Sequence, residues 1–288
     1  MRSAFTNTFK TTILLAFLGA LFVGIGAFFG TGGLVIGLVI GLLFVGGSYW
    51  FSDKIAVAAA RAKPISREEA PRLYEIVEEL AERNDMPMPR LYLSPQPQPN
   101  AFATGRGPKH AVVAVTQGIL EVLDDDELRA VLAHELSHVR NRDILIGSVA
   151  AAIAMAITFI ARIAMFGAIF GGGDDDDGGN IFGLLALAIL APIAAVLIQM
   201  ALSRSREFQA DASGAHLLGE GEPLARALQK IEAYAKRVPM DVNPAEATLF
   251  IINPLTGRQI NFAKLFSTHP PTEERIARLQ EFDRTHAV

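Results

Sequence analysis

Cysteine is absent from the 288-residue chain. Its absence excludes a disulfide framework, a thiol nucleophile and every zinc or iron–sulfur site that uses cysteine ligands. A metal bound by this protein must therefore be held by histidine, aspartate or glutamate. Only six histidines are present, so the candidates among them are few.

Charged residues are scarce as well. They make up 19% of the chain, whereas 51% of the residues are hydrophobic, and the formal net charge is -4. This composition excludes a disordered chain, which combines low hydrophobicity with high net charge. The small negative charge also argues against nucleic acid as a partner. The mean hydropathy of +0.32 instead favours a protein that lies in the lipid bilayer.

Four apolar runs are long enough to cross the hydrocarbon core of a bilayer, which needs about 20 helical residues. They form two pairs, 12–29 with 34–51 and 144–170 with 181–200. The turn inside the first pair is short and rich in glycine, as in a helical hairpin. A cleaved signal peptide is the rival interpretation of the first run, but that run is long for this purpose and a second follows at once. We therefore predict four transmembrane helices.

Lysine and arginine near these runs set the predicted orientation, because the side richer in them faces the cytoplasm. Basic residues precede the first and third runs and follow the second and fourth, which is the same side each time; Arg162 alone departs from this pattern. We predict that both termini and the two polar segments, 52–143 and 201–288, are cytoplasmic. The membrane would then be the inner membrane of the cell, crossed four times.

The polar segments predict helices and a small sheet. Apolar residues at helical spacing predict a helix over 67–83. Acidic residues at 124–127 mark the start of a longer helix, where the helix dipole favours negative charge. Strands are predicted at 91–93, 101–104 and 111–116, and a short helix at 117–123 follows them.

The longer predicted helix contains the motif HExxH, as His134-Glu135-Leu-Ser-His138. Histidines four residues apart project from one face of a helix and can bind one zinc ion. Glu135 can reach a zinc-bound water, take its proton and later pass it to a leaving amine. The alternative is a buried histidine pair on an amphipathic helix, because the motif has false positives.

A catalytic zinc commonly takes a third nitrogen or oxygen ligand and keeps one position open. Glu207 is the best candidate, because it lies seven residues after the fourth apolar run and His138 lies six before the third. A tight hairpin would bring the two together. Asp211, one helical turn further on, can orient a ligating histidine. Taken alone, these two acids would more often be a solvated helix face.

The segments HELSHVRNRD, SRSREFQADASGAHLL, NAFATG and STHPPTEERI, set among four apolar runs in this order, resemble the HtpX family. These are membrane-embedded zinc metallopeptidases related to the CAAX prenyl endopeptidases and the mitochondrial stress peptidases. The resemblance implies a gluzincin-type site with one Zn²⁺ on His134, His138 and Glu207, Glu135 as general base, and Asp211 in support.

The same resemblance implies the substrates and the biological role. It implies an endopeptidase that hydrolyses misfolded or damaged membrane proteins at the cytoplasmic membrane surface, in membrane-protein quality control and the stress response. It also implies self-cleavage during purification.

We therefore predict an α+β, mainly helical protein with four transmembrane helices and a cytoplasmic zincin-like catalytic domain that contains a small sheet. The N-terminal hairpin takes 1–51, and a second hairpin, 144–200, is inserted into the catalytic domain. The first part of that domain, 52–143, carries the HExxH helix, and the second, 201–288, carries the third ligand. Together these two polar segments are long enough to bury the core of one domain.

The segment NAFATG is short, extended and ends in glycine, so it could be the edge strand on which a peptide substrate adds as a further strand. An ordinary edge strand followed by a turn fits equally well. The residues concerned are Asn100, Ala101, Phe102, Ala103 and Thr104.

His269 precedes two prolines that can open a final helix. It could donate a hydrogen bond to the oxyanion of a tetrahedral intermediate, or it could pack on the core where the helix starts. The remaining three histidines, His110, His216 and His286, have no partner at ligand spacing.

Two other classes of function are weaker candidates. A scaffold or zinc sensor would hold a structural metal, but such sites are closed, often by cysteines, and would leave Glu135 without a task. A metal transporter would need polar groups within the apolar runs, where they are nearly absent.

Overall fold

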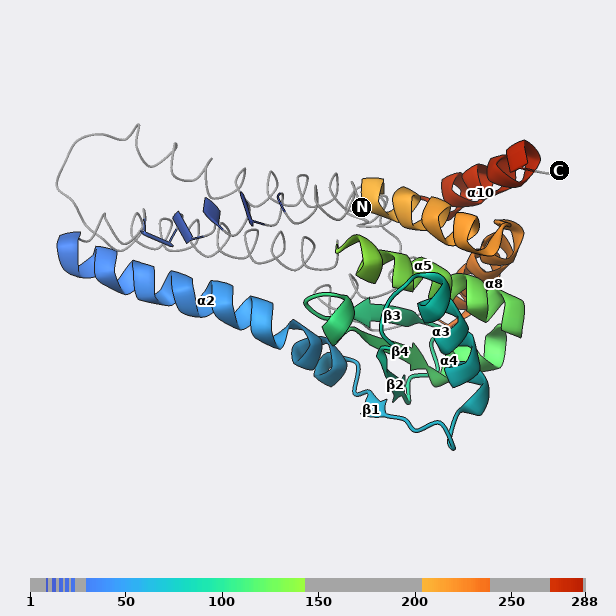
Figure 1. Cartoon of the computed structure of the whole chain (residues 1–288), viewed down its shortest axis with the longest axis horizontal. Coiled ribbons are helices and arrows are strands. Elements are labelled where there is room, and N and C mark those ends of the chain that lie inside the picture. Colours follow the sequence, from blue (N-terminus) through green and yellow to red (C-terminus); the bar gives the residue numbers. More distant parts are fainter. Residues whose placement is uncertain are drawn as a thin grey trace.

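The computed structural model describes residues 30–142, 204–238 and 270–286, with isolated helical positions between 9 and 23 (Figure 1). The second predicted hairpin, with the run of four aspartates at 174–177 between its two apolar runs, lies outside the described residues, as do Arg162, His269 and most of the first apolar run.

Helices dominate the described residues, and a small sheet lies among them. In chain order the elements are α2 (Gly30–Ala59), β1 (Lys63–Pro64), α3 (Pro71–Arg83), β2 (Arg90–Ser94), β3 (Ala101–Thr104), the 3₁₀ turn η1 (Pro108–His110), β4 (Val112–Thr116), α4 (Gln117–Val122), α5 (Asp125–Asn141), α8 (Glu222–Arg237) and α10 (Thr272–His286). A further helix covers 204–218. The predicted α+β, mainly helical class is confirmed.

α2 contains the whole second apolar run and continues beyond it to Ala59. Figure 1 shows its N-terminal part projecting away from the sheet. Many of its large apolar side chains are exposed: Val35, Ile36, Leu38, Val39, Ile40, Leu42, Leu43, Trp50 and Phe51. None of the described helices is both long enough and apolar enough to qualify as a membrane span. The four predicted spans therefore stay predictions.

The sheet has four strands in the order β1-β2-β4-β3, with β2 and β4 parallel and the other two pairs antiparallel. The predicted strands agree with β2, β3 and β4 to within a residue at each end. β3 pairs with β4 alone, in a register that sets Ala103 opposite Val113. β3 is therefore an edge strand of the sheet.

The two faces of the sheet belong to different cores, because side chains alternate along a strand. One face contributes Ala101, Val113 and Val115 to the main core, which also takes residues from α3, α4, α5 and α8. The other face contributes Phe102 and Ala114, which pack with Ala56 from the last turns of α2. α2 is further tied to the sheet by the Ser94 hydroxyl, which donates to the Ala60 carbonyl at 2.6 Å.

The helix predicted over 67–83 begins four residues late, at Pro71. Proline suits the first position of a helix because it lacks an N–H that would be unpaired there. It also disfavours the helical conformation in the residue before it, and Ala70 has φ -141° and ψ 63°. The expected start was therefore wrong, although the buried face of the helix was predicted correctly.

α5 begins with a capping box. The Asp124 carboxylate accepts a hydrogen bond from the Glu127 N–H at 3.0 Å, and the Glu127 carboxylate accepts one from the Asp124 N–H at 3.1 Å. Two otherwise unpaired donors of the first turn are satisfied in this way. Glu127 is buried, and its Oε2 also lies 2.6 Å from Lys230 Nζ of α8. The start of α5 is thus bound to α8 as well as to its own backbone.

Replacing Asp124 by alanine should lower the free energy of unfolding by about 1 kcal/mol, because the capping hydrogen bond is lost. Asp126→Ala is the matched control, since it removes a negative charge from the same helical turn but no cap. Denaturant unfolding of the full chain in detergent measures both. Equal losses would show that charge at the helix start, and not the cap, stabilises α5.

Candidate metal centre

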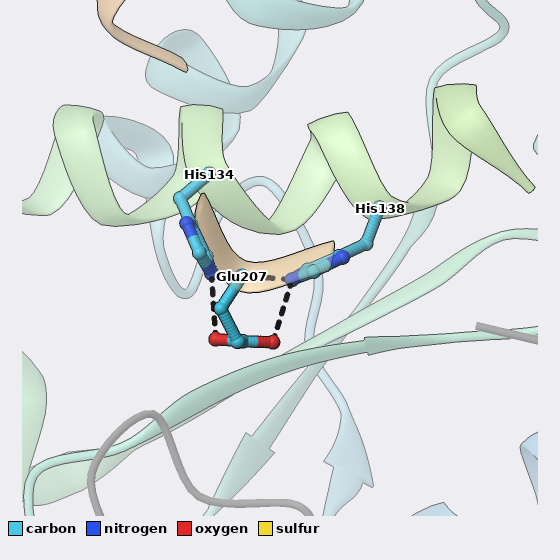
Figure 2. Close-up of side chains that lie close together, drawn as sticks. All are labelled: His134, His138 and Glu207. Atoms are coloured by element: carbon cyan, nitrogen blue, oxygen red, sulfur yellow. Dashed lines mark hydrogen bonds and ion pairs between the residues drawn. The ribbon is translucent and has the colours of Figure 1, made fainter. Parts of the chain in front are cut away.

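His134 and His138 project from the same side of α5, as their spacing predicts (Figure 2). Their Nε2 atoms are 3.2 Å apart. In tetrahedral zinc sites with Zn–N bonds of 2.0–2.1 Å, two ligand atoms are separated by about 3.3 Å. The two imidazoles therefore already have the separation that one shared ion requires.

Glu207 faces both imidazoles from the helix at 204–218 (Figure 2). Its Oε1 lies 3.5 Å from His138 Nε2, and its Oε2 lies 3.7 Å from His134 Nε2. Glu207 is buried, with 6% of the residue exposed. Two nitrogens and a carboxylate are a donor set that zinc commonly takes in catalytic sites. Within the described ranges, no other trio of histidine, aspartate and glutamate side chains is placed to hold a metal.

Close packing of two helices places Glu207 there. Glu207, Asp211 and Gly214 are spaced by four and three residues, so they share one face of their helix. A Cβ atom on Gly214 would lie 3.2 Å from the His134 backbone nitrogen and 3.4 Å from its Cα. Glycine at this position therefore permits the helix to approach α5 closely enough for Glu207 to reach the histidines.

Asp211 contacts the other ring nitrogen of His134, with Nδ1 and Oδ1 2.8 Å apart. This contact orients the imidazole so that Nε2 faces Glu207 and His138. It is the supporting arrangement that metal-binding histidines commonly have; the role of Asp211 in a metal site stays a prediction.

Arg275 completes this group and was not predicted. Its Nε and Nη2 donate to the two oxygens of Asp211 at 2.8 and 2.7 Å, and its Nη1 lies 3.7 Å from Glu207 Oε2. Arg275 belongs to α10 and is 1% exposed. One signal could have found it: Arg275 lies four residues before Leu279, so it shares a face with the apolar side of this otherwise polar helix.

The electrostatics of the group follow from these contacts. Burial by itself lowers the pKa of His134, but hydrogen bonding to Asp211 and Glu207 outweighs it and raises the pKa to about 10. Burial raises the pKa of Asp211, and the opposing effects of Arg275 and His134 lower it to about 2. Without a metal, Asp211 is therefore an anion between two positively charged partners at neutral pH, and zinc binding would release the proton from Nε2 of His134.

Glu135 lies beside the three candidate ligands, with its Oε1 4.0 Å from His134 Nε2. Its Oε2 accepts a hydrogen bond from the Ala103 N–H of β3 at 2.9 Å. Burial raises the pKa of Glu135, which makes this carboxylate a better proton acceptor near neutral pH. The predicted base and the predicted edge strand are thus direct neighbours.

The ends of the predicted edge strand and two further histidines, His216 and His269, were also singled out from the sequence. Asn100 and Thr104 are buried, and the Asn100 N–H donates to the Thr116 hydroxyl at 2.9 Å. His216 stacks edge-on against Phe282 and His286, as rings and not as metal ligands. His269 lies outside the described residues, so its role stays a prediction.

Several known proteins are similar in sequence to this chain. The profile of Peptidase family M48 matches residues 67–283. A protease HtpX homolog from Syntrophobacter fumaroxidans is 54% identical over 280 residues, which cover 95% of this chain and 99% of the relative. Another, from Pelotomaculum thermopropionicum, is 52% identical over 277 residues, which cover 95% and 98%.

A solved structure supports the fold. The crystal structure of S. mikatae Ste24p superposes with a TM-score of 0.56 at 22% sequence identity, over 96% of this chain and 66% of that one. At this identity the likeness concerns the arrangement of the chain alone.

Gly214→Val should weaken zinc binding by about 10–100-fold, the range seen when support behind a metal ligand is disturbed. The reason is that the added side chain pushes Glu207 and Asp211 away from α5. Ala212→Val is the control, because it adds bulk to an exposed position of the same helix. Competition with a zinc-sensitive chelating dye measures the affinity, and equal affinities in the two variants would contradict the packing argument.

Arg275→Met should lower the free energy of unfolding by about 3–5 kcal/mol, because Asp211 would stay buried without its guanidinium partner and with the His134 ring alone. Arg278→Met, on the exposed side of α10, should cost less than about 1 kcal/mol. Denaturant unfolding of the metal-free chain compares them. A similar small loss for both would mean that the buried pair does not stabilise the fold.

Proposed function

Since the chain belongs to peptidase family M48 and is a metallopeptidase homologous to HtpX proteases, we propose that it is a zinc endopeptidase acting at the cytoplasmic membrane surface. The observation that carries this proposal is the convergence of His134, His138 and Glu207, with Glu135 beside them. Nitrogen and oxygen donors suit zinc, and the three atoms fit one ion.

The chain's own residues divide the reaction between them. His134, His138 and Glu207 would hold the ion, and Asp211 keeps the His134 ring turned toward it. Zinc bound there supplies Lewis-acid polarisation of a peptide carbonyl and lowers the pKa of water. Glu135 takes a proton from the attacking water and returns it to the leaving amine.

β3 is the element that we propose to bind the peptide, through Asn100 to Thr104. The Ala103 N–H points away from β4 and toward Glu135, so the outer edge of β3 faces the proposed base. An extended peptide paired with this edge by main-chain hydrogen bonds would bring a scissile bond next to the three ligands. An edge strand binds a peptide through main-chain hydrogen bonds and contacts few of its side chains, which suits unfolded substrates of varied sequence.

We propose that these substrates are misfolded or damaged membrane proteins and that the enzyme works in membrane-protein quality control under stress. The apolar side chains exposed on α2 support placement in a bilayer, as do the four apolar runs and the distribution of basic residues. Two membrane hairpins and a catalytic domain split by the second of them are part of this proposal. Self-cleavage is the expected side reaction when the chain is purified.

A closed structural zinc site is the competing role for the same residues. It would need a fourth protein ligand, and the group placed to hold a metal among the described residues consists of three. Glu135 stands next to this group as a buried carboxylate whose pKa is raised by burial. That position favours a proton acceptor in an open site.

Glu135→Gln should retain bound zinc and lower the cleavage rate by about 10²–10⁴-fold, the range for removal of a general base. Glu121→Gln changes an exposed glutamate of α4 and is the control. The chain is purified in detergent under chelation to prevent self-cleavage, and zinc is then restored. Cleavage of an unfolded protein and zinc per chain are both measured; unaltered cleavage by Glu135→Gln would refute the assignment of the base.

A further inference from the structure

A cavity of about 630 Å³ lies where the end of α2 meets the connection between β3 and β4. It is separate from the candidate metal centre, because none of the metal-site residues lines it. Cationic and aromatic side chains dominate its wall. Among the described residues that line it, the cations are Lys54, Arg90, Arg106 and Lys109, the aromatic residues are Trp50 and Phe51, and the only carboxylate is that of Asp53.

The backbone of the β3–β4 connection is fixed in the shape that forms this cavity. Gly105 has φ +119°, and a Cβ atom there would lie 2.3 Å from the carbonyl oxygen of His110. Only glycine fits such a position. The tight turn carries Arg106 to α2, where its guanidinium lies 4.3 Å from the centre of the Trp50 ring.

The positive charge in the cavity is largely uncompensated. Arg90 pairs with Asp53 at 2.8 Å. For Lys54, Arg106 and Lys109, no carboxylate lies within ion-pair distance in the described part of the chain. In a protein with a net charge of -4, a cavity with this surplus of positive charge favours an anion. Arginine in particular suits phosphate, whose oxygens match its planar donors.

The place of the cavity along α2 indicates where the anion comes from. The apolar run ends at Trp50 and Phe51, and the first charged side chains, Asp53 and Lys54, follow directly. Tryptophan is enriched where a transmembrane helix meets the headgroup layer. If α2 crosses the bilayer as proposed above, the cavity opens at the level of the lipid headgroups.

We propose that this cavity binds the phosphate of an anionic membrane lipid. Lys54, Arg106 and Lys109 would contact the phosphate, and Trp50 and Phe51 would lie against the start of the acyl chains. The proposal rests on the proposed membrane location of α2 and is independent of the peptidase reaction. A bound lipid would fix the catalytic domain against the membrane surface, because the cavity joins α2 to the sheet.

The test uses the full chain carrying Glu135→Gln, which prevents self-cleavage, in a neutral detergent. Phosphatidylglycerol, phosphatidylcholine and inorganic phosphate are titrated separately, and native mass spectrometry and the thermal midpoint report binding. Phosphatidylglycerol should bind more tightly than the other two. The double variant Arg106→Gln/Lys109→Gln should weaken phosphatidylglycerol binding by at least about tenfold, because each cation near an anionic surface raises the affinity about fivefold. Lys63→Gln, an exposed lysine outside the cavity, should leave it unchanged.

Three results would overturn the proposal. These are equal binding of the two lipids, phosphatidylglycerol binding that the double variant leaves unchanged, and inorganic phosphate binding as tightly as the lipid, which would mark a site for a soluble anion. If the double variant does not fold, Lys109→Gln alone serves, because this side chain is exposed on η1; it should weaken binding about fivefold. Binding is read without turnover, so failure here and failure of the peptidase assay are distinguishable.

Discussion

The buried carboxylate of Asp211 is the contact on which the site depends. It lies between the His134 ring of α5 and the Arg275 guanidinium of α10, and it projects from a third helix, at 204–218. A carboxylate removed from water is costly unless charged or hydrogen-bonding partners surround it, and here the Arg275 guanidinium and the His134 ring are those partners. The same contacts that satisfy this charge also turn Nε2 of His134 toward Glu207. Folding and metal binding are therefore coupled through one side chain.

The architecture explains why the ligands come from distant parts of the chain. The sheet and α3 support α5 from one side through the main core, and α8 holds its N-terminal end through Lys230 and Glu127. The helix that carries Glu207 packs on α5 at Gly214, where no side chain intervenes. The edge strand β3 then lies beside Glu135. A rigid helix thus presents two ligands and the proposed base, while its neighbours supply the third ligand and the substrate edge.

Local patterns in the sequence predicted much of this correctly, and long-range contacts account for what was missed. The spacing of His134 and His138 places both on one helix face, and the strand predictions needed only short strand-like segments and the β-branched run at 111–116. Glu207 was found by its distance from an apolar run, and Asp211 by its spacing from Glu207. Arg275 was missed because its partner is 64 residues away in the chain. The cavity beside α2 was missed for the same reason, since its wall combines three separate segments.

X-ray absorption at the zinc edge, on the purified full chain, tests the proposed ligands, because it reports the atoms that surround the metal. We expect one zinc per chain, bound by two imidazole nitrogens and by oxygen from a carboxylate and from water. Glu207→Gln should alter the oxygen shell and lower the zinc content, while the two imidazoles stay in place. A spectrum with more than two imidazoles, or one unaltered by Glu207→Gln, would contradict the assignment of the ligands.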